Sequence, residues 1–533
     1  MKPIRPSSGN PAVSLAAWLK ETPVTHTWDH DRAADHIDKK LKDVKTVEIL
    51  DYTRDMSLES IPTNKAYKID AVHLYADILN IDDMLGTTGV EGVRCHRQTL
   101  TFLNLHYRAV NRILTRSDAR RVDFHNQRLH ALVTKPYGED NEADRVHRAV
   151  AIADLIISVL GQTGDQHEQL PNAKVRVGID SGTALTVNNG RNGGREPLFL
   201  GEPANQAAKM SGGGTAKGIF LTNKARAAVG LGEVNEPKKT ALTEDEIKTS
   251  VQKSKLDVKV ETIVQEWRDD LKKNPIGSFE FSRHTPPLRT IDITKLTPGN
   301  SRRQEAVSTY ADLDGFTAYV ARNIVENADD VVRVLHVLRA ELDRVLTSDF
   351  DGRRVRFIGD CLHGLLCEGT SQTTDEPETV STAVMCAGAL RSSFNLALEK
   401  LEENGIDVEN LGLQIGFELG PMSITRLGMQ GDRVRCSVSR GVLQSEKEQA
   451  RCGKAETAIG QLAYDTGTDA VRDIFGSKRK VADLDYNEAV EALAEKNDKS
   501  ARASKAAAFE LASPAVARVS EVQARPYAKG TGC

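Results

Sequence analysis

A block of sequence that occurs twice limits the fold of this 533-residue chain more than any other feature. The first pair of segments shares Ala, Val, Tyr, Ala and Asp in register. The matched pairs are residues 71–81 with 306–316, residues 112–131 with 344–364, and residues 175–182 with 413–420. The offset between partners stays between 232 and 238 residues, which chance similarity would not maintain. The chain therefore contains one domain used twice.

The second copy shows the order of elements most clearly. An apolar strand pattern ends near an Asp and is followed by an amphipathic helix pattern at 329–346. A hairpin-like pair at 353–357 and 361–366 comes next, then a second helix pattern at 382–401 and a β segment at 411–420. This alternation predicts an α/β or α+β sandwich for each copy.

The repeat also predicts how the chain is divided. We expect an N-terminal extension over residues 1–65, a first copy over 66–232, a charged helical linker over 233–300, a second copy over 301–470, and a charged, Ala-rich tail over 471–533.

Composition excludes several classes of protein. The net charge is -4, so the surface has no general attraction for nucleic acid or anionic lipid. Seven cysteines without a CxxC pair do not form a disulfide framework. The start lacks the apolar stretch of a signal peptide, and no apolar run approaches the roughly 18 residues of a membrane span. We expect a cytoplasmic protein that binds neither nucleic acid nor membrane.

The second copy carries the sharper chemical motifs. In YADLDGFT, Asp312 ends an apolar strand, and Gly315, Phe316 and Thr317 lie at the turn into a helix. Free backbone N–H groups at such a turn receive phosphate oxygens. In VRFIGDCLHG, Asp360 is at the predicted hairpin tip. If the strands are neighbours, the two acids can bridge a metal pair, although either Asp alone is more often a turn former.

The DxxGFT segment followed by VxxIGD resembles the class III adenylate and guanylate cyclases. The resemblance implies a ferredoxin-like core in each copy and a pseudo-symmetric dimer of the two cyclase domains. It also implies two Mg²⁺ or Mn²⁺ ions held by Asp312, the backbone carbonyl of Leu313, and Asp360. The predicted partner of the site is a nucleoside triphosphate substrate.

In that family the second domain supplies an Asn and an Arg spaced N-x-x-x-R on a helix, where residues four apart share a face. The first copy has Asn205 at the Asn position and Lys209 at the Arg position. A Lys neutralises the triphosphate but lacks the bidentate fork of Arg. The second copy has Ser445 and Gln449 instead and supplies no cation.

The first copy keeps Asp77 but has Gln127 where the second has Asp360, and an amide is a poor substitute for a metal-bridging carboxylate. The losses in the two copies are complementary. We therefore expect one competent site between the copies and a defective mirror site, although Asn205 and Lys209 taken alone could be a solvated helix face.

The positions that read the base in purine cyclases are altered. The usual Lys is replaced by Arg356 in the second copy and by Asp123 in the first. Leu198 of the first copy stands where a polar, base-reading residue is expected. An Asp accepts from a ring N–H and an Arg donates to a carbonyl. With Tyr75 and Tyr310 at positions that are commonly Phe, the chain resembles the pyrimidine cyclases of bacterial Pycsar antiphage systems. That resemblance implies cyclic UMP, rather than cyclic CMP, as an alarm signal that a separate effector protein senses.

Two other functions stay open. Ordinary adenylate or guanylate cyclase signalling and a non-catalytic nucleotide-binding scaffold both suit a duplicated cyclase domain. A template-directed nucleotidyltransferase would need a basic groove, which the balanced charge does not support. The sequence does not decide between intrachain pairing of the copies and a homodimer, nor does it identify the activating signal.

Overall fold

The computed structural model describes residues 25–86, 88–165, 169–188 and 197–512. Our expectations for the first 24 residues and for 513–533 lie outside the described residues.

Both copies have the same succession of elements. In the first copy these are β2 (Lys65–Ile78), α2 (Ile81–Leu85), α3 (Val93–Arg116), β3 (Arg120–His125), β4 (Arg128–Val133), α4 (Glu142–Leu160), β5 (Val175–Asn188), β6 (Pro197–Leu200), α5 (Glu202–Ser211), β7 (Gly218–Leu221) and α6 (Asn223–Ala228). In the second copy they are β9 (Ser301–Asp314), α9 (Phe316–Asn323), α10 (Ala328–Arg344), β10 (Arg353–Ile358), β11 (Cys361–Leu366), α11 (Glu376–Glu403), β12 (Gly412–Leu427), β13 (Val434–Val438), α12 (Arg440–Ala450), β14 (Glu456–Ile459) and α13 (Gln461–Thr466).

The other elements flank or join the copies. They are α1 (His30–Asp43), β1 (Glu48–Asp51), α7 (Glu244–Ser254), α8 (Val260–Lys273), β8 (Phe281–Ser282), α14 (Asp469–Phe475), β15 (Lys480–Ala482), α15 (Tyr486–Glu495) and α16 (Lys499–Ala512).

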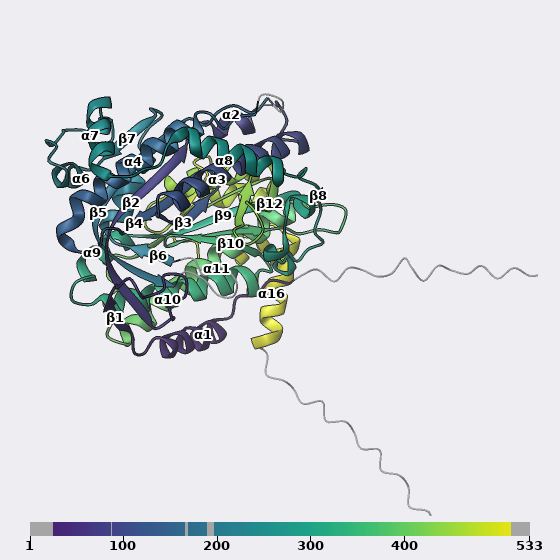
Figure 1. Ribbon diagram of the computed structural model, residues 1–533. Helices are drawn as coiled ribbons and strands as arrows, with labels where there is room; N and C mark the ends of the chain where they lie inside the picture. The colour runs from purple at the N-terminus through teal and green to yellow at the C-terminus, as the bar shows by residue number, and fades with distance from the viewer. Residues whose placement is uncertain (1–24, 87, 166–168, 189–196, 513–533) are drawn as a thin grey trace, which may run out of the picture.

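Each copy forms one sheet with the same strand order. The shared order is β3-β4-β2-β5 in the first sheet and β10-β11-β9-β12 in the second. Beyond it, β6 and β7 pair with β5, β13 and β14 pair with β12, and β15 pairs with β14. The central antiparallel pairs, β2 with β5 and β9 with β12, are long and in equivalent register. The prediction of two tandem cyclase-like α+β domains is confirmed, and Figure 1 shows the two sheets packed together within one chain.

The two copies exchange hairpins, and this exchange joins their cores. The first crossing hairpin is the end of β5 paired with β6, and its Leu198 and Leu200 belong to the core of the second copy. The second crossing hairpin is the end of β12 paired with β13, and its Val434 and Cys436 belong to the core of the first copy. The copies therefore pair within one chain as a pseudo-symmetric dimer.

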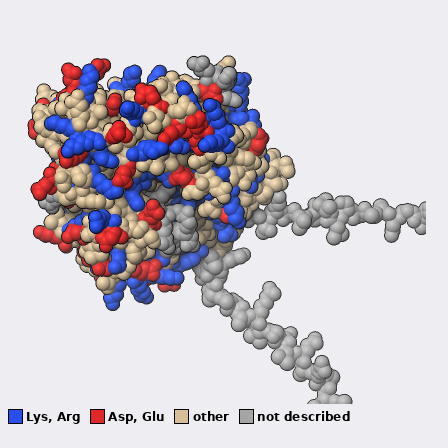
Figure 2. Space-filling view, in the orientation of Figure 1, with Lys and Arg blue, Asp and Glu red and all other residues tan. Residues whose placement is uncertain are grey.

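The flanking segments reinforce this pairing. Helix α1 packs on α10 and α11 of the second copy, while β1 pairs with β2 of the first. The linker helix α8 packs on α3, where the Trp267 indole N–H donates to the Leu105 carbonyl at 3.1 Å. Helix α15 packs on α11. Among the described helices, none is both long enough and apolar enough to cross a membrane. Acidic and basic side chains are interspersed over the face in Figure 2.

Candidate active site

Asp312 and Asp360 lie next to each other on neighbouring strands. Leu362 of β11 pairs with Ala311 of β9, so Cys361 comes opposite Asp312. Ile358 pairs with Cys361 across the β10–β11 turn, which leaves Asp360 at the tip beside them. Two carboxylates from separate sequence motifs are thus brought together by the register of three strands.

The electrostatics of this pair favour a bound cation. Burial, followed by the charges of Asp314 and Glu446, raises the pKa of Asp312 to about 6. Burial and the charge of Asp312 also raise the pKa of Asp360 well above its usual value, which the nearby Arg339 only partly offsets. Two acids that share a site resist ionising together unless a positive charge joins them.

The turn into α9 exposes backbone donors beside the two acids. Gly315 precedes the helix with a φ of 76°, and a Cβ there would lie 2.6 Å from the Asn410 carbonyl oxygen. Only Gly fits such a position without strain. Phe316 is buried and anchors the turn by stacking on Tyr319, at 6.0 Å between ring centroids. The first N–H groups of α9 and the Thr317 hydroxyl can therefore face an anion.

Asn205 reaches this turn from the other copy. Its side-chain amide donates to Thr317 Oγ1 at 2.9 Å, across the boundary between the copies. Helix α5, which carries Asn205, lies directly on β5 because Gly178 leaves room, since a Cβ there would come within 2.2 Å of the Ala207 carbonyl oxygen. Lys209, one turn further along α5, is exposed, and the described residues form no ion pair with it.

Asp123 and Arg356, the two altered base-reading positions, bind each other across the interface. The Arg356 guanidinium forms an ion pair with the Asp123 carboxylate and donates to the Phe124 carbonyl at 3.0 Å. Arg356 also donates to the Arg435 carbonyl. The sequence predicts an acceptor at Asp123 and a donor at Arg356 without their relative geometry, and the structure combines them into one donor–acceptor pair. Leu198 is buried in the core of the second copy.

Each of the two tyrosines stacks on a histidine of its own copy. Tyr310 stacks on His363 at 4.4 Å between centroids, and its hydroxyl lies 3.4 Å from His125 Nε2 of the other copy. Tyr75 stacks on His130 in the same way, at 4.1 Å. Burial lowers the pKa of His363 to about 3 and that of His125 well below its usual value, so both rings are neutral.

The mirror site contains a cation of its own. Arg128 lies 3.4 Å from Asp77 Oδ2 and 3.7 Å from Glu446 Oε1, and so joins an acid from each copy. Sequence reasoning considered Gln127 and missed this neighbour. A signal was present, because Arg128 occupies the position of Cys361 in the other copy, directly after the place of the acid in the repeat.

A second group missed from the sequence contacts Asp312. The Gln449 amide donates to Asp312 Oδ2 at 3.4 Å and to Gln414 Oε1 at 2.8 Å. Gln449 aligns with Lys209 in the repeat and supplies no cation, and it contacts the acid of its own copy. This contact holds the Asp312 carboxylate in place.

The donor set fits a metal ion only together with substrate. Among the described residues no group of three or more His, Cys, Asp or Glu side chains could hold a metal ion alone. Mg²⁺ is usually bound by one or two carboxylates plus substrate phosphates and waters. Asp312 and Asp360, whose charges repel each other without a cation, are suited to that shared mode.

Three proteins are similar to the chain along most of its length. A uridylate cyclase from Pseudomonas aeruginosa is 60% identical over 508 residues, covering 95% of this chain and 99% of that protein. A uridylate cyclase from a Rhizobium species is 40% identical and covers 78% of this chain and 82% of its own length.

A solved structure from Pseudomonas aeruginosa, described as a class III adenylyl cyclase-like ATP-binding protein, is 62% identical. It covers 88% of this chain and all of its own, with a TM-score of 0.87. No protein-family model matches the chain. At this identity and coverage, the chain belongs to the class III nucleotide cyclase family, in the group that contains the uridylate cyclases.

Proposed function

We propose that the chain converts a nucleoside triphosphate, UTP in preference to CTP, into the 3′,5′-cyclic monophosphate and diphosphate. One observation carries this proposal: Asp312 and Asp360 of the second copy lie together, and Asn205 of the first copy reaches Thr317 beside them. The site thus draws on both copies, as the complementary losses require. The names of the two curated relatives support uridylate cyclase activity.

The Asp123–Arg356 pair supports a pyrimidine substrate. Uracil presents a ring N–H between two carbonyl oxygens, and the pair offers a carboxylate acceptor beside guanidinium donors. Cytosine lacks that ring N–H, so it matches the pair less well. ATP and GTP are the alternative substrates, and the replacement of the purine-reading residues argues against them.

In the proposed mechanism the chain orients the substrate and balances charge. Asp312, the Leu313 carbonyl and Asp360 would hold two Mn²⁺ or Mg²⁺ ions, which supply Lewis acidity at the ribose 3′-hydroxyl and at the phosphates. The turn of Gly315, Phe316 and Thr317 receives phosphate oxygens through its backbone donors.

Two side chains of the first copy complete the site. Asn205 positions the ribose, and Lys209 balances charge that develops at the α-phosphate. The ribose 3′-hydroxyl loses its proton to solvent, and its oxygen forms the bond to the α-phosphorus while the bond to the leaving diphosphate breaks.

The proposed biological role is an alarm signal. A cyclic pyrimidine nucleotide made by a cytoplasmic enzyme would be sensed by a separate effector protein in antiphage defence. The competing function is a non-catalytic nucleotide-binding scaffold with the same fold.

Product formation separates these possibilities. Purified protein is incubated with UTP, CTP, ATP or GTP and Mn²⁺, and the products are identified by chromatography. We expect cyclic UMP from UTP as the main product. Failure to form a cyclic product from any of the four, in the presence of a lysate from phage-infected cells as activator, would favour the scaffold.

A matched pair of variants tests the assignment to one site. Asp360→Ala should lower turnover by about 1,000-fold or more, because metal ions supply several kcal/mol of transition-state stabilisation. Gln127→Ala, at the equivalent hairpin tip of the first copy, should keep most of the activity. Equal losses in both variants would mean that the mirror site is also catalytic.

A further inference from the structure

A buried arginine with unused hydrogen-bond donors faces a cavity behind the hairpin that carries Asp360. Arg339 of α10 is 6% exposed, and its Nε and Nη2 atoms have no hydrogen-bond partner among the residues that the structure describes. Its guanidinium stacks on the Phe357 ring, 4.0 Å from the centroid. Buried donors in native proteins nearly always have a partner. The unused donors of Arg339 therefore point to a ligand.

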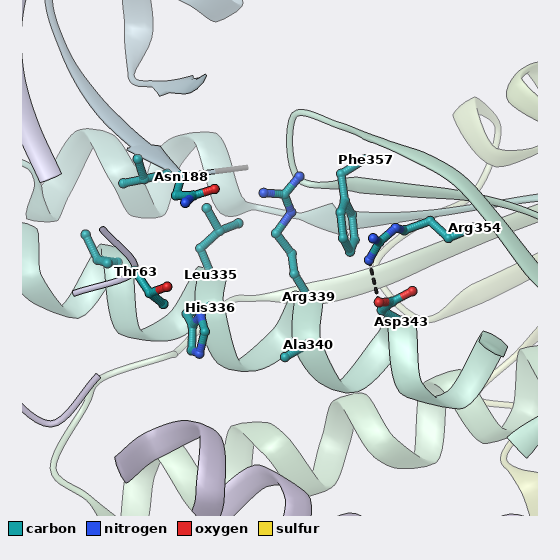
Figure 3. Close-up of a pocket in the computed structure, with 11 residues that line it drawn as sticks. Thr63, Asn188, Leu335, His336, Arg339, Ala340, Asp343, Arg354 and Phe357 are labelled. Carbon is teal, nitrogen blue, oxygen red and sulfur yellow. Dashed lines mark hydrogen bonds and ion pairs between the residues drawn. The ribbon is translucent and has the colours of Figure 1, made fainter. Parts of the chain in front are cut away.

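The cavity lies between the two copies, and two arginines interrupt a lining that is otherwise largely apolar. Arg339 and Arg354 come from the second copy, Asn188 comes from the first, and Thr63 comes from the N-terminal extension. Arg354 is already paired with Asp343, whereas Arg339 has no ion pair among the described residues. Figure 3 shows Arg339 rising from α10 toward Phe357, with Asn188 on the opposite wall.

The cavity lies on the other face of the sheet from Asp312, although the charge of Arg339 acts on Asp360. Successive side chains of a strand point to opposite faces of the sheet. On β9, Ala311 packs in the same core as α10, whereas Ser308 contacts α12 through Ser445. Asp312 alternates with Ala311 and so faces the α12 side, away from α10. The hairpin of β10 and β11 therefore separates the cavity from the face that carries Asp312.

The equivalent place in the first copy is filled by a neutral side chain. Tyr107 stands 232 residues before Arg339, at the offset of that part of the repeat. It packs on Phe124 at 5.0 Å between ring centroids, and its hydroxyl donates to the Asp432 carbonyl at 2.8 Å. Of the two described copies, the one that carries Asp312 and Asp360 thus has the guanidinium at this position.

Charge and size indicate the class of ligand. Burial lowers the pKa of Arg339 to about 9, so the empty cavity is a poor environment for the cation. An anion would supply both the missing charge and the missing acceptors. The cavity, with about 100 Å³ open to the centres of water-sized groups, has room for a small oxyanion.

We propose that the cavity between α10 and the end of β5 binds a phosphate-type oxyanion, with Arg339 as its principal ligand. Inorganic phosphate and the phosphate end of diphosphate share this chemistry. The site does not depend on the proposed cyclase activity.

Calorimetric titration of the full chain with inorganic phosphate, without metal or nucleotide, tests the proposal. Wild-type protein should bind phosphate, and Arg339→Met should weaken binding at least tenfold. Lys209→Met removes the cation of the candidate active site and should leave phosphate binding unchanged. Unchanged binding by Arg339→Met, loss only in Lys209→Met, or no binding by the wild type would each overturn the proposal.

A second variant keeps the proposal testable if Arg339→Met does not fold. Asn188→Asp keeps the size of the side chain but gives the cavity its own carboxylate, which should compete with phosphate and weaken binding at least tenfold. If Arg339→Met does not fold, unchanged binding by Asn188→Asp refutes the site. Titration with diphosphate under the same conditions tells which of the two anions is preferred. Competition by UMP would contradict the assignment of a phosphate-sized ligand.

Discussion

At the scale of single residues, the paired acids Asp312 and Asp360 should weaken the metal-free fold at neutral pH. The pKa of Asp312 is raised from 3.8 to about 6, and that of Asp360 is also raised. The folded chain therefore binds protons more tightly than the unfolded chain. The stability that this gives is present at low pH and is lost as pH rises from about 4 through 6.

Asp360→Asn should therefore stabilise the metal-free protein at pH 7, by about 1 to 3 kcal/mol in the free energy of unfolding. The gain should vanish near pH 4.5, where the wild-type acids are protonated. Urea denaturation at both pH values measures it. A loss of stability in Asp360→Asn at pH 7 would contradict the repulsion.

The control for that variant is a buried acid whose pKa is shifted the other way. Burial alone would raise the pKa of Glu341, but hydrogen bonds from His36 and Arg344 outweigh it and lower that pKa. The ionised form of Glu341 therefore stabilises the fold at neutral pH. Glu341→Gln should destabilise the chain at pH 7 in the same urea experiment, opposite in sign to Asp360→Asn.

A second prediction concerns the contribution of Arg128, the cation of the mirror site, to stability. Arg128→Met leaves Asp77 and Glu446 without their shared partner, so the free energy of unfolding should fall by about 1 to 3 kcal/mol. The double variant Asp77→Asn/Arg128→Met should recover part of that loss, which a double-mutant cycle in urea measures. Strictly additive losses would mean that the contact contributes nothing.

The local motifs could be identified from the sequence, but the side-chain contacts between the two copies could not. The hairpin that places Asp360 beside Asp312 follows from a strand pattern and a two-residue turn. The ion pair of Asp123 with Arg356 joins residues 233 positions apart, and no local pattern reports it. The role of Arg128 is not evident from the motif around Gln127, because one of its two partners, Glu446, belongs to the other copy.

At the scale of elements, the crossing hairpins are where the copies depend on each other. Leu198→Ala should lower the free energy of unfolding by about 2 to 4 kcal/mol, because it opens a cavity in the core of the second copy. Val90→Ala is the control, since Val90 is 81% exposed, and should change stability by less than about 0.5 kcal/mol. Urea denaturation compares the two. Equal, small effects would show that the hairpin is dispensable.

The elements also show what the sequence left open. The 3.6-residue periodicity and the repeat predict the central strands, the hairpin and the two long helices of each copy, but not the shorter strands β6, β7, β13 and β14. The packing of the linker could not be predicted in this way, because an amphipathic pattern does not indicate which surface the helix packs against. Helix α8 is fixed on the first copy by Trp267 and by the Asp270 carboxylate, which pairs with Arg108.

At the scale of the whole molecule, the exchanged hairpins predict that one chain builds its own site. Asp360→Ala lacks the proposed metal-binding half, and Asn205→Ala lacks part of the other half. If the site forms within a chain, mixing these two inactive proteins should restore no activity, because every interface joins one intact half to one defective half. If the halves met between chains, the mixture would assemble intact sites.

The shared cores make exchange between chains costly, since Leu198 and Val434 would have to leave the opposite copies first. Production of cyclic nucleotide after overnight mixing at equal concentration is the measurement. The control is a mixture of wild type with a double variant that carries both substitutions in one chain. The activity of this mixture should equal that of the wild-type fraction alone. Recovery in the first mixture of more than a few per cent of wild-type turnover would place the catalytic interface between chains.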